Sequence, residues 1–598
     1  MKCISTEDPL TTTDFVGSIF TSLPSVGGLW LPEKIEKMDS EFFHNLPGMT
    51  FLEISTRVLS HLLGDDSSLL EEIIEEAYPF QPLIESINDN EHFLETFWGP
   101  TFTFKDFGAQ FMAVYLQRTL ENRYRDIPPE VQRPVYTVLV STSGDTGSAI
   151  ASAFEGKSFF KVVILYPNNR VSDIQELQLT TYGDNVTSLA IESDFDTCQR
   201  FVKNILKGDR VGEVISANSI NTARLLPQCL YYFYAYSVLK KPGRGVSFVV
   251  PCGNCGNLTG GIIARELGLP IDYFIAAQNS NNTLEKFINT GYYKPQSTIN
   301  TISNAMDVGD PSNVKRIVHM FRGREEEMRD IIKTVSVSDQ DTKDSIKHVY
   351  DTFGYIIDPH TAVAYSGYRK LKVEDRDFVF VSTAHPAKFS TTIEGVIGRC
   401  SSVSKLDNLR LVPKKKYIVN NNYEKCIGML EKMGRRKGVV LIGMPGSGKT
   451  SVARELSKVY GLEYKDIDES MELVYNCRLP SILLQYGEAG LKSIEEKTIM
   501  TTDLSTPVIA TGGSVIYSEK GIRHLKNNIV LYLRTDFRVL TERTNNFTDR
   551  GVLFNGKSPI EMYKERDVMY ESICDVTIDC HNLRVLDIAH VVKNLLPT

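Results

Sequence analysis

The sequence lacks the features that mark secreted, membrane-spanning and nucleic-acid-binding proteins. No apolar run approaches the length needed to cross a bilayer. The first residues, MKCISTEDPLTTTDF, have no apolar core and no arginine-rich character, so we expect neither a secretory signal nor a transit peptide. The net charge of −8 at pH 7 gives no indication of nucleic acid or an anionic membrane as a partner. The ten cysteines follow no repeated spacing, which favours reduced thiols and a cytoplasmic location.

The chain is long enough for several folding units. Its 598 residues exceed what one core organises, and a typical domain of about 150 residues predicts three to five units. Strand-like runs that end in small polar residues alternate with helical segments. This pattern predicts an α/β fold with parallel sheets and sites at the carboxyl ends of the strands. The runs are Val135–Val140, Phe160–Leu165, Val246–Val250, Phe378–Val381 and Val439–Ile442.

Lys105 lies in an aromatic run just before an amphipathic helical pattern. An amine beside apolar groups loses hydration, which lowers its pKa and frees its lone pair to attack an aldehyde. The alternative is a lysine that extends past the edge of a core helix. A glycine-rich segment, residues 251–261, follows one strand and precedes a helix, where backbone N–H groups can enclose an anion. Together these features predict pyridoxal phosphate (PLP), although Cys252 and Cys255 leave a redox pair as an alternative.

From about residue 10 to 400 the sequence resembles threonine synthase, a fold-type II PLP enzyme with tryptophan synthase β-like parallel sheets. The resemblance implies that O-phospho-L-homoserine and water give L-threonine and phosphate. It divides this part into an N-terminal subdomain, residues 1–100, and a catalytic domain, residues 101–400. A phospho-lyase that releases a keto acid is the alternative. The matching segments are Gly27–Pro32, Gly99–Asp106, Ser143–Gly147, Ser216–Arg224, Ala305–Asn313, Asp358–Ala362 and Ser382–Phe389.

The same resemblance implies roles for individual residues, each of which could alone be a turn or a cap. Lys105 would hold PLP and move protons on the substrate. Thr383 would face the pyridine nitrogen. The cofactor phosphate would lie against Gly253, Asn254, Cys255, Gly256 and Asn257. The substrate carboxylate would bind Ser143, Gly144, Asp145 and Thr146. The candidates near the substrate phosphate are Asn218, Ser219, Asn221 and Arg224.

The C-terminal part contains the pattern G-x-x-x-x-G-K-S/T, directly after a strand and before a helical pattern, which predicts a nucleotide site for ATP. Lys449 would reach the β- and γ-phosphates, and Thr450 would hold Mg²⁺ with Asp466. Asp468 would accept the proton of the attacking hydroxyl. The expected nucleotide ligands are Gly443, Pro445, Gly446, Ser447, Gly448, Lys449 and Thr450.

Residues 437–580 resemble shikimate kinase, on Gly487-Glu488, Glu495, Ala510–Gly513, Arg550, and Arg566 with Tyr570. The resemblance implies a kinase domain over 438–598. In it, Arg550 would be a lid arginine on the nucleotide, and Arg566, Lys492, Gly512 and Gly513 would contact the acceptor. Four residues depart from the family: Leu491, Lys492, Ser514 and Gly551. Lysine in place of arginine at 492 removes a planar two-point grip on a carboxylate, which leaves the acceptor open.

Residues 401–437 change character, and there we expect a linker with a short helix at about 423–433. Three hypotheses remain for the part that follows. It phosphorylates shikimate, independently of the threonine step; it phosphorylates homoserine and supplies the PLP domain; or it binds nucleotide and regulates the chain. We expect small-molecule substrates for both parts, and the sequence leaves open whether the chain forms a homodimer.

Overall fold

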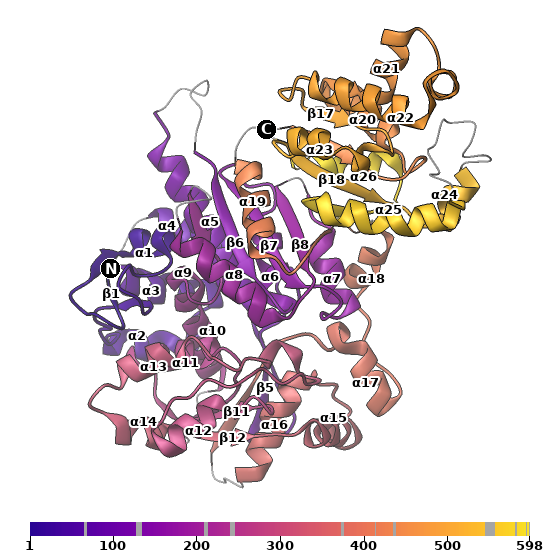
Figure 1. Cartoon of the computed structure of the whole chain (residues 1–598). Coiled ribbons are helices and arrows are strands. Elements are labelled where there is room, and N and C mark those ends of the chain that lie inside the picture. The colour runs from indigo at the N-terminus through magenta and orange to yellow at the C-terminus, as the bar shows by residue number, and fades with distance from the viewer. Residues whose placement is uncertain are drawn as a thin grey trace. The chain divides into compact units, whose positions relative to one another are not determined.

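The computed structural model contains two compact units, each built from several stretches of chain (Figure 1). The first unit comprises Met1–Ile164, Asn169–Leu179 and Glu213–Leu411, and the second Leu165–Asn168, Thr180–Gly212 and Val412–Thr598. Among the described residues no helix is both long and apolar enough to span a bilayer. The structure describes residues 1–64, 68–126, 134–183, 185–208, 213–239, 245–371, 376–412, 414, 416–434, 438–543, 557–580, 583–593 and 595–596.

A six-stranded sheet in the first unit has the order β12-β11-β10-β13-β5-β4 and is parallel except for the edge strand β4. Its strands are β4 (Leu83–Ser86), β5 (Glu91–Glu95), β10 (Val246–Pro251), β11 (Ile271–Gln278), β12 (Ile332–Ser336) and β13 (Asp377–Ser382). Val249 is paired with Phe380, so the loops after β10 and β13 leave the sheet at the same edge. Helices α11 (Gly256–Glu266), α12 (Thr283–Thr290), α14 (Glu325–Ile331) and α16 (Pro359–Leu371) pack on these strands.

Further parallel strands precede the loops in which the sequence predicted substrate-binding residues. In a sheet separate from the six-stranded one, β6 (Tyr136–Ser141) lies between β7 (Phe160–Pro167) and β9 (Val214–Ser216). Helix α5 (Lys105–Arg123) packs against α4 (Ser68–Ala77), α6 (Asp145–Phe154) and α9 (Thr222–Leu225) (Figure 1). Both Lys105 and Asp145 are therefore the first residues of neighbouring helices, as the sequence predicted for Lys105.

The N-terminal residues form a small antiparallel sheet with helices around it. The sheet order is β2-β1-β3, with β1 (Lys2–Ser5), β2 (Thr12–Asp14) and β3 (Trp30–Pro32). The remaining helices of the unit are α1 (Phe15–Thr21), α2 (Ser40–Asn45), α3 (Phe51–Leu63), α7 (Asp173–Thr180), α10 (Leu230–Leu239), α13 (Val314–Met320), α15 (Asp339–Phe353), α17 (Ser390–Ile397) and α18 (Ser404–Asn408). Arg316 of α13 donates hydrogen bonds to the carbonyls of Trp30 and Ser219, which fixes β3 to the segment before α9.

The second unit contains parallel strands in the order β16-β17-β15-β18-β19. They are β15 (Val439–Ile442), β16 (Tyr464–Asp466), β17 (Val508–Ala510), β18 (Ile529–Arg534) and β19 (Val576–Asp579). Leu441 and Asp466 are both paired with Ala510, so the loops after these three strands meet at one edge. The helices are α20 (Lys449–Tyr460), α21 (Ile467–Tyr475), α22 (Leu479–Met500), α23 (Glu519–Leu525), α24 (Phe537–Arg543), α25 (Pro559–Ile573) and α26 (Val585–Lys593).

Two further strands of this unit were not predicted as partners. β14 (Tyr417–Val419), from the expected linker, pairs antiparallel with β19 and parallel with β8 (Val186–Ile191). The ring of Phe201 in α8 (Phe195–Lys207) lies 5.4 Å from that of Tyr423 in α19 (Tyr423–Gly434). Helix α19 lies where the sequence predicted a short helix, at about residues 423–433. A strand of three residues is too short to show the alternation by which strands are recognised.

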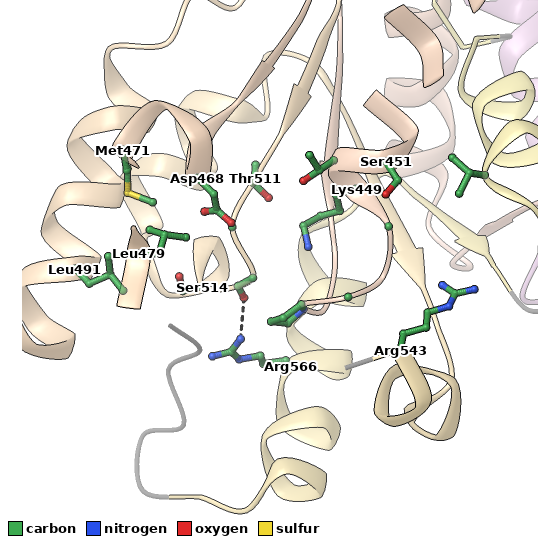
Figure 2. A pocket seen from close by; sticks show the side chains of 17 residues that line it. Lys449, Ser451, Asp468, Met471, Leu479, Leu491, Thr511, Ser514, Arg543 and Arg566 are labelled. Carbon is green, nitrogen blue, oxygen red and sulfur yellow. Dashed lines mark hydrogen bonds between the residues drawn. The ribbon is translucent and has the colours of Figure 1, made fainter. Parts of the chain in front are cut away.

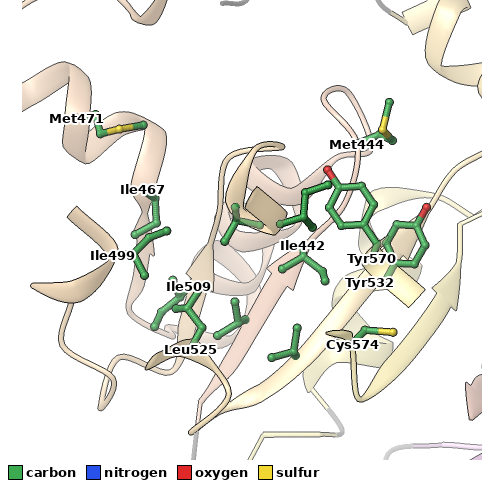
Figure 3. Close-up of a cluster of buried hydrophobic side chains, with 14 of the residues drawn as sticks. Ile442, Met444, Ile467, Met471, Ile499, Ile509, Leu525, Tyr532, Tyr570 and Cys574 are labelled. Carbon is green, nitrogen blue, oxygen red and sulfur yellow. The ribbon is translucent and has the colours of Figure 1, made fainter. Parts of the chain in front are cut away.

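A buried apolar cluster fills the space between the second unit's strands and helices (Figure 3). It includes Ile442 of β15 and Ile509 of β17, both at most 1% exposed, together with Ile499 of α22. The rings of Tyr532 and Tyr570 stack with their centroids 4.9 Å apart, which fixes α25 against β18. Both units are α/β with parallel sheets, which confirms the predicted fold class.

Neighbouring residues of α13 test how the first unit is stabilised. Ile317 is fully buried, whereas Val318 is 42% exposed. We expect Ile317→Ala to lower the free energy of unfolding by about 2–5 kcal/mol because it leaves a cavity. Val318→Ala should cost about 1 kcal/mol or less. Urea unfolding followed by tryptophan fluorescence measures both, since Trp30 and Trp98 lie in this unit. Equal losses would contradict the described packing of α13.

Candidate active sites

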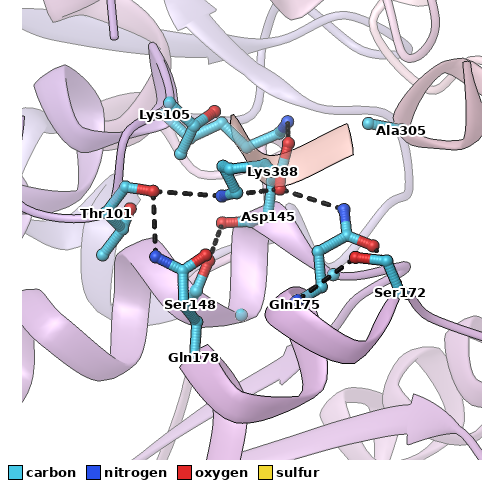
Figure 4. A network of polar contacts seen from close by, with 12 residues as sticks. Thr101, Lys105, Asp145, Ser148, Ser172, Gln175, Gln178, Ala305 and Lys388 are labelled. Atoms are coloured by element: carbon cyan, nitrogen blue, oxygen red, sulfur yellow. Dashed lines mark hydrogen bonds and ion pairs between the residues drawn. The ribbon is translucent and has the colours of Figure 1, made fainter. Parts of the chain in front are cut away.

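Lys105 is the first residue of α5, and its amine lies beside the carboxylate of Asp145 (Figure 4). Its Nζ lies 3.5 Å from Asp145 Oδ2 and 4.9 Å from the centre of the Phe104 ring. Burial lowers the pKa of Lys105, and although Asp145 opposes this, the nearby cations Lys388 and Arg224 add to it. The aromatic neighbour and the lowered pKa agree with the setting that the sequence predicted, and the role of Lys105 with the cofactor stays a prediction.

Asp145 is held by a second lysine. Lys388 is fully buried, its Nζ lies 2.8 Å from Asp145 Oδ1, and it also donates to the carbonyl of Thr101 (Figure 4). Gln175 donates to the same carboxylate oxygen. Burial would raise the pKa of Asp145, but Lys388 and Lys105 outweigh it and hold that pKa well below its usual range. Asp145 is thus a permanent carboxylate that orients the Lys105 amine.

The glycine-rich loop after β10 closes against the chain around residue 305. A Cβ on Gly253 would lie 2.8 Å from Met306 Cα, so only glycine fits there. Cys255 has a φ of +58° and caps the N-terminus of α11, where free N–H groups favour an anion. Asn254 donates to Ser219 Oγ and accepts from the Ser312 N–H. The loop is therefore rigid and shaped for close approach by an anionic group.

The cysteines of this loop do not favour redox chemistry. Cys252 and Cys255 are both at most 2% exposed and free. Burial, together with the adjoining Cys255, raises the pKa of the Cys252 thiol well above its ordinary value. A reactive cysteine needs a lowered pKa and solvent access.

Two buried polar atoms near this site, Asn257 Nδ2 in the first turn of α11 and Ser382 Oγ at the end of β13, have no hydrogen-bond partner among the described residues. Asn257 Oδ1 accepts from the hydroxyls of Tyr231 and Tyr232, which leaves its amide donor for another group. The carbonyl of Thr383 accepts from the Phe104 N–H, which joins the loop after β13 to the start of α5. The residues present therefore fit a phosphate-bearing aldehyde such as PLP.

The candidates for substrate binding fall into two groups. In the loop before α6, Gly144 has a φ of +137° and its N–H donates to Thr142 Oγ1, while Ser143 of this loop and Thr146 of the first turn of α6 are partly exposed. The second group is bonded mainly to the chain itself: Asn218 bridges to the backbone of Ser141, and Asn221 caps α9. Arg224 donates to the Ala217 carbonyl, its Nε has no partner, and burial lowers its pKa to about 10.

The second unit contains a nucleotide loop between β15 and α20. Gly443, Gly446 and Gly448 have φ values of +146°, +84° and +100°, which glycine adopts without strain. Lys449 Nζ donates to the carbonyls of Gly443 and Met444. Burial lowers the pKa of Lys449 to about 8 against the opposing effect of nearby aspartates. Thr450 Oγ1 donates to Asp466 Oδ2 at 2.7 Å, so the two expected Mg²⁺ ligands adjoin.

A cavity of about 410 Å³ opens beside this loop (Figure 2). Asp468 and Lys449 point into it, and burial, followed by the charge of Asp466, raises the pKa of Asp468 to about 6. At the other end, Arg566 donates to the Gly513 carbonyl. Lys492 lies 4.8 Å above the ring of Tyr517. The cavity is lined by Pro445, Gly446, Gly448, Lys449, Thr450, Ser451, Asp468, Met471, Leu479, Leu491, Thr511, Gly512, Gly513, Ser514, Arg543, Arg566 and Val585.

Comparisons with known proteins find relatives both of the part that contains Lys105 and of the part that contains Lys449. The family model for pyridoxal-phosphate dependent enzymes matches residues 87–384, and that for the threonine synthase N terminus matches residues 2–78. Threonine synthase from Buchnera aphidicola subsp. Baizongia pistaciae is 40% identical over 405 residues, which cover 66% of this chain and 91% of that protein. The chain belongs to the threonine synthase family. The shikimate kinase model matches residues 445–596, so the threonine synthase part is fused to a shikimate kinase-like domain.

Solved structures of threonine synthases superpose on the same part. The crystal structure from Escherichia coli has a TM-score of 0.67 at 34% identity and covers 72% of this chain and 99% of that chain. The PLP-bound threonine synthase from Brucella melitensis has a TM-score of 0.67 at 30% identity, with the same coverage.

Sequence analysis missed several residues of the two sites. Lys388 falls in a matching segment, but nothing local indicated that it would contact Asp145. Gln175 lies in a helix without a recognisable motif. Arg543 lines the kinase cavity and ends α24, which only the fold reveals. The proposed lid residue Arg550 lies outside the described residues, so its role stays a prediction.

The Gly253 contact makes a testable prediction about the cofactor loop. Gly253→Ala should push the loop from Met306 at a cost of about 1–3 kcal/mol. That corresponds to an affinity for PLP lowered about ten- to a hundredfold. Titration of dialysed protein with PLP, followed by absorbance, measures it. Gly395→Ala is the matched control, because a Cβ at Gly395 would meet nothing within 4 Å. An unchanged affinity in Gly253→Ala would show that this loop does not hold the cofactor.

Proposed function

We propose that the threonine synthase part converts O-phospho-L-homoserine and water into L-threonine and phosphate, using PLP. The Lys105 amine, which lies 3.5 Å from the buried carboxylate of Asp145, carries the proposal. When bound, PLP would supply an electron sink for the substrate. Lys105, with its lowered pKa, is suited to take up and return protons near neutral pH. Residues 253–257 would hold the cofactor phosphate, and the loop before α6 would bind the substrate carboxylate.

Product analysis tests this proposal directly. The chain supplied with O-phosphohomoserine and PLP should release threonine and phosphate in equal amounts; a keto acid instead would mean a phospho-lyase. Lys105→Ala should lower the rate at least about 100-fold because proton transfer is lost. Its control is Lys157→Ala, which removes a lysine that pairs with Glu76. A Lys105→Ala variant as active as the control would overturn the assignment of the proton carrier.

We also propose that the shikimate kinase-like domain transfers the γ-phosphoryl group of ATP to a small hydroxyl acceptor. Thr450 and Asp466 would hold Mg²⁺, Lys449 would contact the phosphates, and Asp468 would accept the hydroxyl proton. The single observation that supports this most strongly is the placement of Asp468 and Lys449 in one cavity beside the nucleotide loop (Figure 2). This order of groups matches the needs of phosphoryl transfer, which depends on positioning and charge.

Shikimate and homoserine are the two candidate acceptors. Shikimate follows from the family. Homoserine is favoured by Lys492, whose amine lies over the Tyr517 ring where the family has an arginine for a carboxylate. Phosphorylated homoserine would be the substrate of the preceding domain, and fusion raises its effective concentration. The test is an assay of the whole chain with PLP, ATP, Mg²⁺ and either acceptor: threonine made from homoserine supports the serial arrangement, and ADP formed only with shikimate overturns it.

The pKa of Asp468 makes the kinase pH-dependent. Its pKa is raised to about 6, and only the carboxylate can accept a proton, so kcat/KM should fall as the pH falls through about 6. Asp468→Asn should lower kcat about 10²- to 10⁴-fold with ATP binding retained. Glu469→Gln is the control, because Glu469 pairs with Arg454 at the surface. Full activity of Asp468→Asn would contradict its role as base.

A further inference from the structure

Glu495 is a buried carboxylate with one oxygen unused by the chain. It lies on α22 and is 2% exposed. Its Oε2 accepts a hydrogen bond from Ser514 Oγ at 2.6 Å, while Oε1 is buried and has no hydrogen-bond partner in the part of the chain that the structure describes. The helical path of α22 is interrupted at Gly487, with a φ of +68°, which gives the part that carries Glu495 its own direction. A buried carboxylate oxygen without a partner indicates a site where a ligand can donate the missing hydrogen bond.

The unpaired oxygen of Glu495 and one carboxylate oxygen of Asp468 lie close to the same point on the cavity wall. Glu495 Oε1 and Asp468 Oδ1 lie 2.5 and 2.6 Å from the position that a Cβ would take on Gly512, a residue that lines the cavity. Burial, followed by the charge of Asp468, raises the pKa of Glu495 to about 7. Two acidic groups therefore lie close to one point, and the charge of Asp468 disfavours a second charge on Glu495.

The cations of the cavity do not remove this excess of negative charge. Arg566 and Lys449 both act to lower the pKa of Glu495, but it remains raised. The described hydrogen bonds of Lys449 go to backbone carbonyls of the nucleotide loop. Among the described residues, no group of three or more acidic, histidine or cysteine side chains is arranged to hold a metal ion. A cationic group on the acceptor itself would supply the positive charge that the cavity lacks.

We propose that Glu495, together with Asp468, binds the ammonium group of an amino-acid acceptor that carries a primary hydroxyl. This inference rests on the proposed kinase function and narrows its substrate class. The acceptor carboxylate would bind at Arg566, and its hydroxyl would face Asp468. Homoserine belongs to this class, and shikimate, which has no amine, does not.

The reaction balances with groups already named. The acceptor hydroxyl oxygen forms a bond to the γ-phosphorus of ATP, and the bond between that phosphorus and the β,γ-bridging oxygen breaks. ADP leaves with the bridging electron pair, and Asp468 takes the hydroxyl proton. The ammonium stays charged throughout and serves only for binding, so its removal should affect recognition more than the chemical step.

A series of acceptors tests the proposal on the full chain with ATP and Mg²⁺. The probes are homoserine, N-acetylhomoserine, 4-hydroxybutyrate, which lacks the amine, and shikimate. We expect kcat/KM for homoserine to exceed that for either amine-blocked or amine-free analogue by about 100-fold or more, since a site with buried polar groups rejects a ligand that leaves them unpaired.

The variant Glu495→Gln separates recognition from folding. It removes the charge but keeps an acceptor for Ser514, so kcat/KM for homoserine should fall about 10- to 100-fold while that for 4-hydroxybutyrate and the KM for ATP stay unchanged. Glu496→Gln, at the adjacent position, is the control, because Glu496 accepts from Ser518 and faces Lys520. A loss with both acceptors would mean a structural role for Glu495 and would overturn the proposal.

The remaining outcomes distinguish this inference from the function on which it rests. Equal use of homoserine and 4-hydroxybutyrate, or phosphorylation of shikimate alone, would overturn ammonium recognition and leave the kinase proposal standing. If no acceptor is phosphorylated by a chain that still makes threonine from O-phosphohomoserine, the kinase proposal itself fails.

Discussion

The ion pair between Lys388 and Asp145 is the contact on which the first active site depends. Both side chains are almost fully buried, and loss of one partner from such a pair costs about 3–5 kcal/mol because the other charge is left alone. With Asp145 held as a carboxylate, the Lys105 amine has a fixed anion 3.5 Å away and remains in place despite the penalty of burial. The lysine that bears the proposed chemistry is thus positioned by a lysine that does not.

In the second unit, the pKa values of two buried carboxylates are raised, whereas that of Asp145 is lowered. Burial and a neighbouring carboxylate raise the pKa values of Asp468 and Glu495 to about 6 and about 7, whereas other carboxylates of this unit, such as Glu571, pair with an arginine. Groups with pKa values perturbed in this way are concentrated at functional sites. In the loop before α20, Lys449 Nζ donates to the carbonyls of Gly443 and Met444, and burial lowers the pKa of this lysine to about 8.

Much of the fold could be predicted because its signals are local. The helical spacing of apolar residues after Lys105 predicted a helix start, and α5 begins at that residue. Strand-like runs predicted β6, β7, β10, β13 and β15, whose apolar side chains are buried. The spacing of glycines predicted the loops at residues 251–261 and 443–450. Glycine adopts positive φ values without strain, and its lack of a side chain permits close backbone contacts. Strand β14 and its pairing with β8 escaped prediction, since three residues carry no period and the partner lies far away in the sequence.

The sequence by itself determined the element types, the two loops and the family, since each depends on residues close together in the chain. Only the tertiary structure decided which charges meet. Lys388 contacts the Thr101 carbonyl across 287 residues of sequence, and no local pattern encodes that encounter. The same holds for Glu495 and Asp468, which come together at Gly512 from different helices. Electrostatic energy depends on distance and burial, and both quantities exist only once the chain has folded.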